Sequence, residues 1–220
     1  IDSGVSLDAV YLDFAKAFNK LPHNRLLLKL TSHGITGKLW SWIEDWLNDR
    51  RQRVCLQGKK SGWRKVKSGV PQGSVLGPIL FLIYINDLDV NINSLVFKFA
   101  DDTKLLARVD NEAERDCLQT DLDALVEWSR RWQMSFNTEK CKVMHFGIKN
   151  QSFEYKMNDQ VLTTVETQKD LGIEITSDLK SSAQCLRAYK KAIQVLGMIK
   201  RTIHYKNADI MGHMLSTLSV

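Results

Sequence analysis

Two adjacent aspartates, Asp101 and Asp102, separate two apolar runs and restrict the possible folds more than any other stretch of the 220-residue chain. The runs, Leu95–Ala100 and Leu105–Ala107, contain residue types typical of strands, so they predict a β-hairpin that turns at the two acids. Two carboxylates held together repel each other unless a cation neutralises them, and Mg²⁺ prefers oxygen ligands of this kind. Because aspartate is also common in turns, an ordinary surface hairpin is the alternative interpretation.

A third aspartate, Asp13, ends another predicted strand. Ala9–Leu12 is a short apolar run typical of a strand covered on both faces, and a carboxylate at its end needs a partner. Asp13 could instead cap a helix that begins just after it. If a sheet unites Asp13 with the aspartate pair 88 residues further on, the three acids form a divalent-metal site suited to phosphoryl transfer.

A loop rich in glycine and proline lies between these acids in the sequence. Residues 69–78 read Gly-Val-Pro-Gln-Gly-Ser-Val-Leu-Gly-Pro, which predicts a bent loop that a ligand can approach closely. The loop presents the polar side chain of Gln72 and leads into a helix from about Ser74. A helix N-terminus behind a glycine loop is a favourable place for phosphate.

The charge of the chain favours a polyanionic partner. Lys and Arg number 31 against 25 Asp and Glu, which gives a net charge of +6. Lysine and arginine are frequent in a β-hairpin predicted around Gly58–Gly62. Their side chains either face water or contact a phosphate backbone. The longest apolar run, Ile79–Ile85, is too short to span a bilayer, so no membrane partner is expected. Four scattered cysteines favour a reducing, intracellular setting.

The second half of the chain predicts two long amphipathic helices, over residues 113–132 and 183–203. The second of these helices is basic. Between the two helices, the sequence predicts a turn at 134–142 with two lysines and a strand at 143–146. It also predicts a hairpin of 153–156 with 161–165 and a short strand at 171–175.

Several motifs, taken in order, resemble the palm motifs of reverse transcriptases. The first three are Tyr-Leu-Asp-Phe-Ala-Lys-Ala-Phe (11–18), the loop at 69–78 and Phe-Ala-Asp-Asp (99–102). Asn-Thr-Glu-Lys-Cys-Lys (137–142) and Lys-Asp-Leu-Gly-Ile (169–173) resemble the next two. The sequences of these motifs are most similar to those of non-LTR retrotransposons, the LINE or jockey-like group. The resemblance covers most of the chain.

The resemblance implies an α+β fold: a polymerase right-hand palm, with an antiparallel sheet packed on helices, partial fingers and the start of a thumb. The palm with part of the fingers would occupy residues 1–180, and the truncated, helical thumb region residues 181–220. The implied activity is that of an RNA-directed DNA polymerase in a retrotransposon, which transfers nucleotides from dNTPs to a primer 3′-hydroxyl. The implied partners are an RNA template, a DNA primer and dNTPs, in the nucleus or in a cytoplasmic ribonucleoprotein.

The resemblance also implies catalytic roles for four residues. Asp13 and Asp101 would bind two Mg²⁺ ions, or Mn²⁺, with Asp102 beside them. Lys140 would protonate the leaving pyrophosphate, in preference to Lys142.

Roles in binding nucleotide and primer follow in the same way. Phe18 would be the steric gate that excludes a ribose 2′-hydroxyl, and Gln72 and Gly73 would line the incoming nucleotide and the template. Leu171 and Gly172 would form the primer grip.

The chain also departs from the family pattern. Asn19 stands where the family usually has aspartate, and the chain begins just before the first motif, without the basic fingers. The isolated fragment is therefore expected to be inactive. The alternative function is that of a truncated, catalytically dead remnant that at most binds nucleic acid. Such a fragment would show salt-sensitive RNA binding without a Mg²⁺-dependent product.

Overall fold

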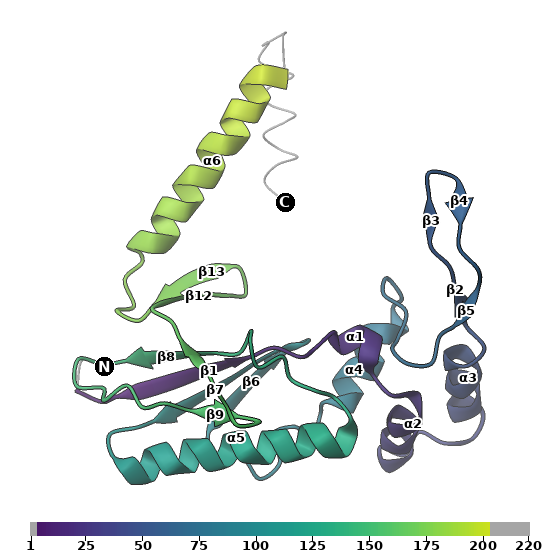
Figure 1. Cartoon of the computed structure of the whole chain (residues 1–220), viewed down its shortest axis with the longest axis horizontal. Helices are drawn as coiled ribbons and strands as arrows, with labels where there is room; N and C mark the ends of the chain where they lie inside the picture. The colour runs from purple at the N-terminus through teal and green to yellow at the C-terminus, as the bar shows by residue number, and fades with distance from the viewer. Residues whose placement is uncertain (1–3, 203–220) are drawn as a thin grey trace. The chain divides into compact units, whose positions relative to one another are not determined.

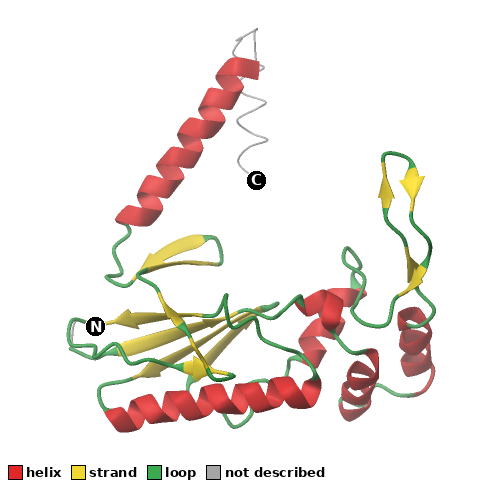
Figure 2. Ribbon diagram, in the orientation of Figure 1, coloured by secondary structure: helices red, strands yellow, loops and turns green. Residues whose placement is uncertain are grey.

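An antiparallel sheet packed on a long helix forms the centre of the first part of the chain (Figure 1; Figure 2). The computed structural model describes residues 4–202, which divide between Glu166 and Thr167 into two units. In spatial order, the sheet of the first unit consists of β11 (Thr163–Thr164), β8 (Lys142–Phe146), β1 (Leu7–Leu12), β7 (Asp102–Arg108) and β6 (Leu95–Phe99). Neighbouring strands are antiparallel except β11, which runs parallel to β8.

The two faces of this sheet differ in burial. On one face, Val10 pairs with Leu105 on one side and Val143 on the other, and all three are buried in the main core. The helix α5 (Glu112–Trp132) covers this face and contributes a buried row of Leu118, Leu122 and Leu125 at helical spacing. The opposite face includes Asp102 and the exposed rings of β6, because side chains on a strand alternate.

Shorter helices and a hairpin extend the first unit beyond one end of the sheet (Figure 1). The helices are α1 (Ala17–Lys20), α2 (His23–Ser32), α3 (Gly37–Leu47) and α4 (Leu76–Tyr84). The hairpin consists of β2 (Arg51–Gln52), β3 (Cys55–Leu56), β4 (Lys59–Lys60) and β5 (Arg64–Lys65). A smaller hairpin, β9 (Lys156–Met157) with β10 (Gln160–Val161), precedes β11.

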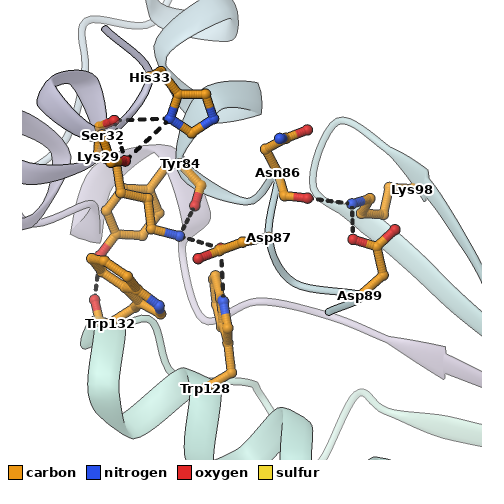
Figure 3. A network of polar contacts seen from close by, with 10 residues as sticks. All are labelled: Lys29, Ser32, His33, Tyr84, Asn86, Asp87, Asp89, Lys98, Trp128 and Trp132. Atoms are coloured by element: carbon orange, nitrogen blue, oxygen red, sulfur yellow. Dashed lines mark hydrogen bonds and ion pairs between the residues drawn. The ribbon is translucent and has the colours of Figure 1, made fainter. Parts of the chain in front are cut away.

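A buried lysine joins three of the helices (Figure 3). Lys29 of α2 donates hydrogen bonds to the carbonyl of Tyr84 and to the carboxylate of Asp87, which also accepts from Trp128 Nε1 at 2.9 Å. The ammonium lies 3.9 Å from the ring centroid of Trp132 and 4.9 Å from those of Tyr84 and Trp128. The charge thus ties α2 to the end of α4 and to α5.

The second unit contains a β-hairpin and a helix. The strands β12 (Thr167–Asp170) and β13 (Ile173–Thr176) pair antiparallel, and α6 (Ser182–Thr202) follows. Arg187 of α6 lies 3.3 Å from the carboxylate of Glu174 on β13, which connects the helix to the hairpin. The strand predicted over 171–175 was wrong at its start, because Leu171 and Gly172 form the turn between the two strands.

The α+β class and the antiparallel sheet packed on helices are confirmed. The helix predicted over 183–203 corresponds to α6, although Ile203 and residues up to 220 lie outside the described part of the chain. The division at 180/181 stays a prediction. Among residues 4–202, no helix is long and apolar enough to cross a membrane.

Candidate active site

Asp13 is the first residue past β1, and packing on both sides fixes its backbone. Before it, Leu12 is buried in the core; after it, the ring of Phe14 stacks on Phe136 at 4.6 Å. The carbonyl of Asp13 accepts the backbone N–H of Asn137 at 2.7 Å. The carboxylate itself is partly exposed. Buried apolar neighbours therefore hold an acid at the open end of the sheet.

The other two acids lie at the tip of the β6–β7 hairpin. Phe99 pairs with Asp102, so the turn consists of Ala100 and Asp101, and Asp102 is the first residue of β7. Ala100 has a φ of +52°, a positive value at the first turn residue as in a type II′ turn. The predicted hairpin is confirmed, but only one of the two acids belongs to the turn itself.

Strand register brings Asp13 and this hairpin together. Leu12 pairs with Thr103, so Asp13 and Asp102 are the next opposing positions of β1 and β7. Asp101 follows directly in the turn. All three acids therefore lie at the same end of the sheet, although 88 residues separate Asp13 from Asp101 in the sequence.

The three acids carry the kind of oxygen ligand that Mg²⁺ prefers. Among residues 4–202, no three His, Cys, Asp or Glu side chains are close enough together to hold a metal ion alone. Mg²⁺ in phosphoryl-transfer sites is typically bound by one or two carboxylates and the phosphates of the substrate, not by a closed protein cage. Asp13 opposite Asp102, with Asp101 adjacent, matches that arrangement.

One of the two lysines after α5 lies beside Asp13. The Lys140 Nζ lies 3.8 Å from the Asp13 carboxylate, and both side chains are substantially exposed, so this pair adds little to stability. Lys142 instead donates to the carbonyl of Glu139 at 3.1 Å. Burial raises the pKa of the Cys141 thiol to about 11, so that thiol is protonated at neutral pH.

Phe18 and the glycine loop meet across a very tight backbone contact. Gly69 has a φ of +80°, and a Cβ there would lie 2.6 Å from the carbonyl oxygens of Phe18 and Asn19. Val70 donates its N–H to the Phe18 carbonyl at 2.8 Å. The ring of Phe18 stacks on Phe81 of α4 at 4.6 Å. Only glycine fits at position 69, and the contact fixes Phe18 beside the loop.

Gln72 and Gly73 are exposed at the bend of this loop, just before α4. Ser74 closes the bend: its hydroxyl donates to the Pro71 carbonyl at 2.7 Å and accepts the Gly77 N–H at 3.0 Å. The structure therefore brings Phe18 to the same loop as Gln72 and Gly73.

The loop is also held from the side of α2 and α3. Arg50 Nη2 donates to the Gly69 carbonyl at 2.6 Å, and His23 Nε2 lies 2.8 Å from the same oxygen. Burial lowers the pKa of His23, the hydrogen bond to the Gly69 carbonyl opposes this shift, and the nearby charge of Arg50 lowers the pKa further. The sequence did not identify either residue, since neither belongs to a motif.

Leu171 and Gly172 form a two-residue turn in the second unit. Both have positive φ, +46° and +90°, as a type I′ hairpin requires. Leucine is rare in this conformation, and the Leu171 side chain is exposed. Because they belong to the other unit, their role at the acids stays a prediction.

Lys104 was not identified from the sequence. It lies two residues beyond Asp102 on the same face of β7 and pairs with Tyr11 on β1 and Phe97 on β6. Its ammonium is 5.8 Å from the Tyr11 ring centroid and 5.4 Å from that of Phe97. The alternation of strand side chains past Asp102 could have revealed this cation beside the acids.

Two curated proteins illustrate the similarity of the sequence to known ones. The RNA-directed DNA polymerase from mobile element jockey of Drosophila melanogaster is 30% identical over 182 residues, which cover 78% of this chain and 20% of that protein. The probable RNA-directed DNA polymerase from transposon BS of the same species is 29% identical over 211 residues, or 88% and 23%. The chain thus spans about a fifth of the length of these relatives.

Solved telomerases share the fold. That of Candida albicans, in complex with a fragment of telomeric RNA, matches with a TM-score of 0.55 at 16% identity, over 79% of this chain and 30% of that one. Apo telomerase from Candida tropicalis gives a TM-score of 0.55 at 12% identity, over 81% and 32%. The family model described as reverse transcriptase (RNA-dependent DNA polymerase) matches residues 8–200. With the acids, the glycine loop and the palm sheet in this order, the chain belongs to the reverse transcriptase family.

Proposed function

We propose that this chain is the palm and part of the fingers of an RNA-directed DNA polymerase that transfers a nucleotidyl group from a dNTP to a primer 3′-hydroxyl. The observation that carries the proposal is the register of β1 and β7, which sets Asp13 opposite Asp102 with Asp101 in the adjoining turn. Acids that lie together at a solvent-exposed sheet face suit phosphoryl transfer, because this reaction depends mainly on positioning the triphosphate and stabilising its charge.

Asp13 and Asp101 would hold two Mg²⁺ ions, with Asp102 beside them, and Mn²⁺ suits the same oxygen ligands. When bound, such ions activate the attacking hydroxyl and neutralise charge on the phosphates. The carboxylates of this chain would bind the ions and thereby orient the phosphates. Lys140, 3.8 Å from Asp13, would supply the proton that the leaving pyrophosphate takes up.

Phe18 would exclude the ribose 2′-hydroxyl and so favour deoxynucleotides. Its support is the stack on Phe81 and the tight contact at Gly69, which leave the ring little freedom to move aside. Gln72 and Gly73, exposed at the bend of the loop, would line the incoming nucleotide and the template.

The second unit would contact the primer. Leu171 and Gly172 would form the primer grip, and α6, with bases such as Lys190 and Lys191, would begin the thumb from residue 181. The RNA template and DNA primer would be handled in the nucleus or in a cytoplasmic ribonucleoprotein. The similarity to RNA-directed DNA polymerases of mobile elements supports the general role in extending a primer on RNA.

Primer extension tests the proposal directly. With poly(rA), oligo(dT) and dTTP, we expect a longer protein that contains this chain to form a Mg²⁺-dependent product. Asp101→Ala in that protein should reduce the product by at least about 100-fold, more than is typical for loss of an outer-shell partner of a metal ligand. Chelation of Mg²⁺ should remove the product as well. Gel analysis of the labelled primer measures both effects.

Asp123→Ala is the matched control, because Asp123 is an exposed acid on α5, which covers the other face of the sheet. Equal activity of the Asp101→Ala variant and the wild type would refute the assigned role. A wild-type chain that binds RNA in a salt-sensitive way, yet forms no product with Mg²⁺, would favour the alternative of a binding-only remnant.

A further inference from the structure

The positive charge of the chain is concentrated in one segment. Arg50–Lys67 contains eight of the 31 Lys and Arg and none of the 25 Asp and Glu. Its charge therefore exceeds the net +6 of the whole chain, and the other residues together are slightly acidic. Such a concentration of positive charge in one segment is typical of a local binding site for a polyanion, and solubility alone does not require it.

The segment forms a hairpin that extends away from the helices of the first unit (Figure 1). Every residue of its four short strands is exposed. Arg51 pairs with Lys65 near the base, and Leu56 pairs with Lys59 near the tip. The hairpin therefore contributes almost nothing to the core, and packing does not explain its residues.

A β-bulge changes the register in the middle of the hairpin. Gln52 pairs with Arg64, which makes Arg53 and Trp63 the next opposing positions, yet Val54 accepts the backbone N–H of Ser61 at 2.9 Å. Gly62 is thus the extra residue. Bulges often re-aim side chains beside functional sites, and this one adjoins Trp63.

Trp63 forms a flat, accessible surface in a cationic setting. Its side chain is 58% exposed, and the Arg53 guanidinium lies over the ring at 4.4 Å from the centroid. A groove of about 730 Å³ adjoins the ring and is lined by residues of both strands, including Gln52, Arg53 and Arg64. None of the described residues that line it carries a carboxylate.

A second basic hollow continues from the base of the hairpin. It has a volume of about 930 Å³ and is lined by four cations, Lys20, Arg25, Lys65 and Lys67, with no acid among its described lining residues. Arg64 of the groove and Lys65 of this hollow are consecutive on β5. The phosphate backbone of a nucleic acid could therefore contact lysine and arginine side chains all the way from the groove to the hollow.

The base of the hairpin is fixed to the rest of the first unit. Val66 donates its N–H to the Arg50 carbonyl at 2.8 Å, which closes the stem. The Arg50 side chain donates to the carbonyls of Leu47 at 3.1 Å and Gly69 at 2.6 Å. The groove is thereby held by the same residue that supports the loop of Gln72, and it lies on elements other than those of the three acids.

We propose that this hairpin is a binding site for single-stranded nucleic acid. In this site, one unpaired nucleobase stacks on Trp63, and the neighbouring phosphates contact the surrounding lysine and arginine side chains. An exposed ring stacks on a base only when that base is free of a duplex partner, and the cations attract the backbone without regard to sequence. The proposal goes beyond nucleotidyl transfer, since binding here requires neither the acids nor a metal ion.

Fluorescence anisotropy with a labelled mixed-sequence 12-mer tests the stacking role on the full chain, without Mg²⁺ or dNTP. Trp63→Ala should weaken binding of single strands about 5- to 100-fold, and Trp63→Tyr should retain most of the affinity. An abasic 12-mer keeps the phosphates but has no bases, so the wild type and Trp63→Ala should bind it equally. RNA and DNA versions of the 12-mer show which sugar the site prefers.

Trp42→Ala is the matched control, because Trp42 is 55% exposed on α3, a helix with Lys38 as its single base. Equal losses for Trp63→Ala and Trp42→Ala would overturn the proposal, and so would an unchanged affinity of Trp63→Ala for the 12-mer. Equal binding of a blunt duplex and the single strand would also overturn it. Asp101→Ala should bind normally, so a failure of this proposal is distinct from a failure of the catalytic one.

The salt dependence of binding tests the cationic role. Replacement of Lys59, Lys60 and Arg64 by glutamine should lower the slope of log K against log salt by about 2, at roughly 0.7 for each lost contact with a single strand. The same replacement of the exposed Lys38, Lys149 and Lys156 changes the total charge equally and should leave the slope unchanged. Equal slopes for the two triple variants would contradict the site.

Discussion

Lys29 carries a charge in an almost dry environment, whereas its partner Asp87 is much more exposed to water. Its side chain is 2% exposed, whereas that of Asp87 is 38% exposed. Burial lowers the pKa of Lys29, and the hydrogen bond from Lys29 to Asp87 partly opposes that shift. The rings of Trp132, Trp128 and Tyr84 supply the rest of its surroundings (Figure 3). The lysine therefore depends on the aspartate more than the aspartate depends on the lysine.

This asymmetry predicts different costs for the two single substitutions. Asp87→Asn should reduce the free energy of unfolding by about 3 kcal/mol, because it leaves a buried ammonium without its carboxylate. Lys29→Met should cost less, since it retains the apolar stem among the rings and leaves a carboxylate that water can reach. Urea unfolding at pH 7 measures both values. A larger loss for Lys29→Met would contradict the argument.

The pH dependence of the Asp87→Asn variant gives an independent check on the same prediction. Without Asp87, the pKa of Lys29 in the folded state falls further below its value in the unfolded state. The unfolded state then holds more protons as the pH rises, so the stability of the variant should increase between about pH 7 and pH 10. A flat profile relative to the wild type would show that Lys29 is not the destabilised group.

Among the elements, the β12–β13 hairpin shows how a single turn residue escapes sequence analysis. Leu171 is apolar and lies beside Ile173, so propensity favours a strand there. In the structure, Asp170 pairs with Ile173, and Leu171 has a φ of +46° in the turn. Gly172 was the available signal for a turn. Residues in sparsely populated backbone conformations cluster at ligand-binding sites, so the conformation of Leu171 motivates a direct test of its role.

Leu171→Asn should therefore stabilise the hairpin while reducing primer extension. The substitution creates an Asn-Gly pair, which suits a type I′ turn, and should relieve about 1 kcal/mol of backbone strain. Hydrogen exchange of the β12–β13 amides measures the local gain. Leu179→Asn is the control: Leu179 is also exposed with a φ of +55° but lies outside the turn. If Leu171→Asn left primer extension intact, Leu171 would have no role in gripping the primer.

Other elements show why a helix could be predicted from the sequence and the pairing of a strand could not. Helix α5 was expected over 113–132 and spans Glu112–Trp132, because its apolar positions recur at helical spacing over many turns. By contrast, β11 has two residues, Thr163 and Thr164, and joins the sheet through parallel pairing with β8. Such pairing depends on tertiary placement, so no local pattern indicates it.

In the whole molecule, the candidate site arises from sheet register more than from local sequence. The identities of Asp13, Asp101 and Asp102 were predictable because each ends or begins an apolar run. Their meeting at one end of the sheet required the order β1–β7–β6, which no local pattern specifies. The roles of His23 and Arg50 could not be predicted, because the Gly69 carbonyl that both approach is defined only by tertiary contacts.

The location of the main core predicts where the chain can be shortened. Its buried residues run from Val10 to Leu162, all within the first unit, so a chain that ends at Glu166 should unfold cooperatively near the temperature of the full chain. A chain that ends at Gln160 loses β11 and buried Leu162, and should melt about 5–10 °C lower, as expected for the loss of a buried leucine. Circular dichroism during heating compares the two. Non-cooperative melting of the chain that ends at Glu166 would show that the core of the first unit requires residues beyond Glu166.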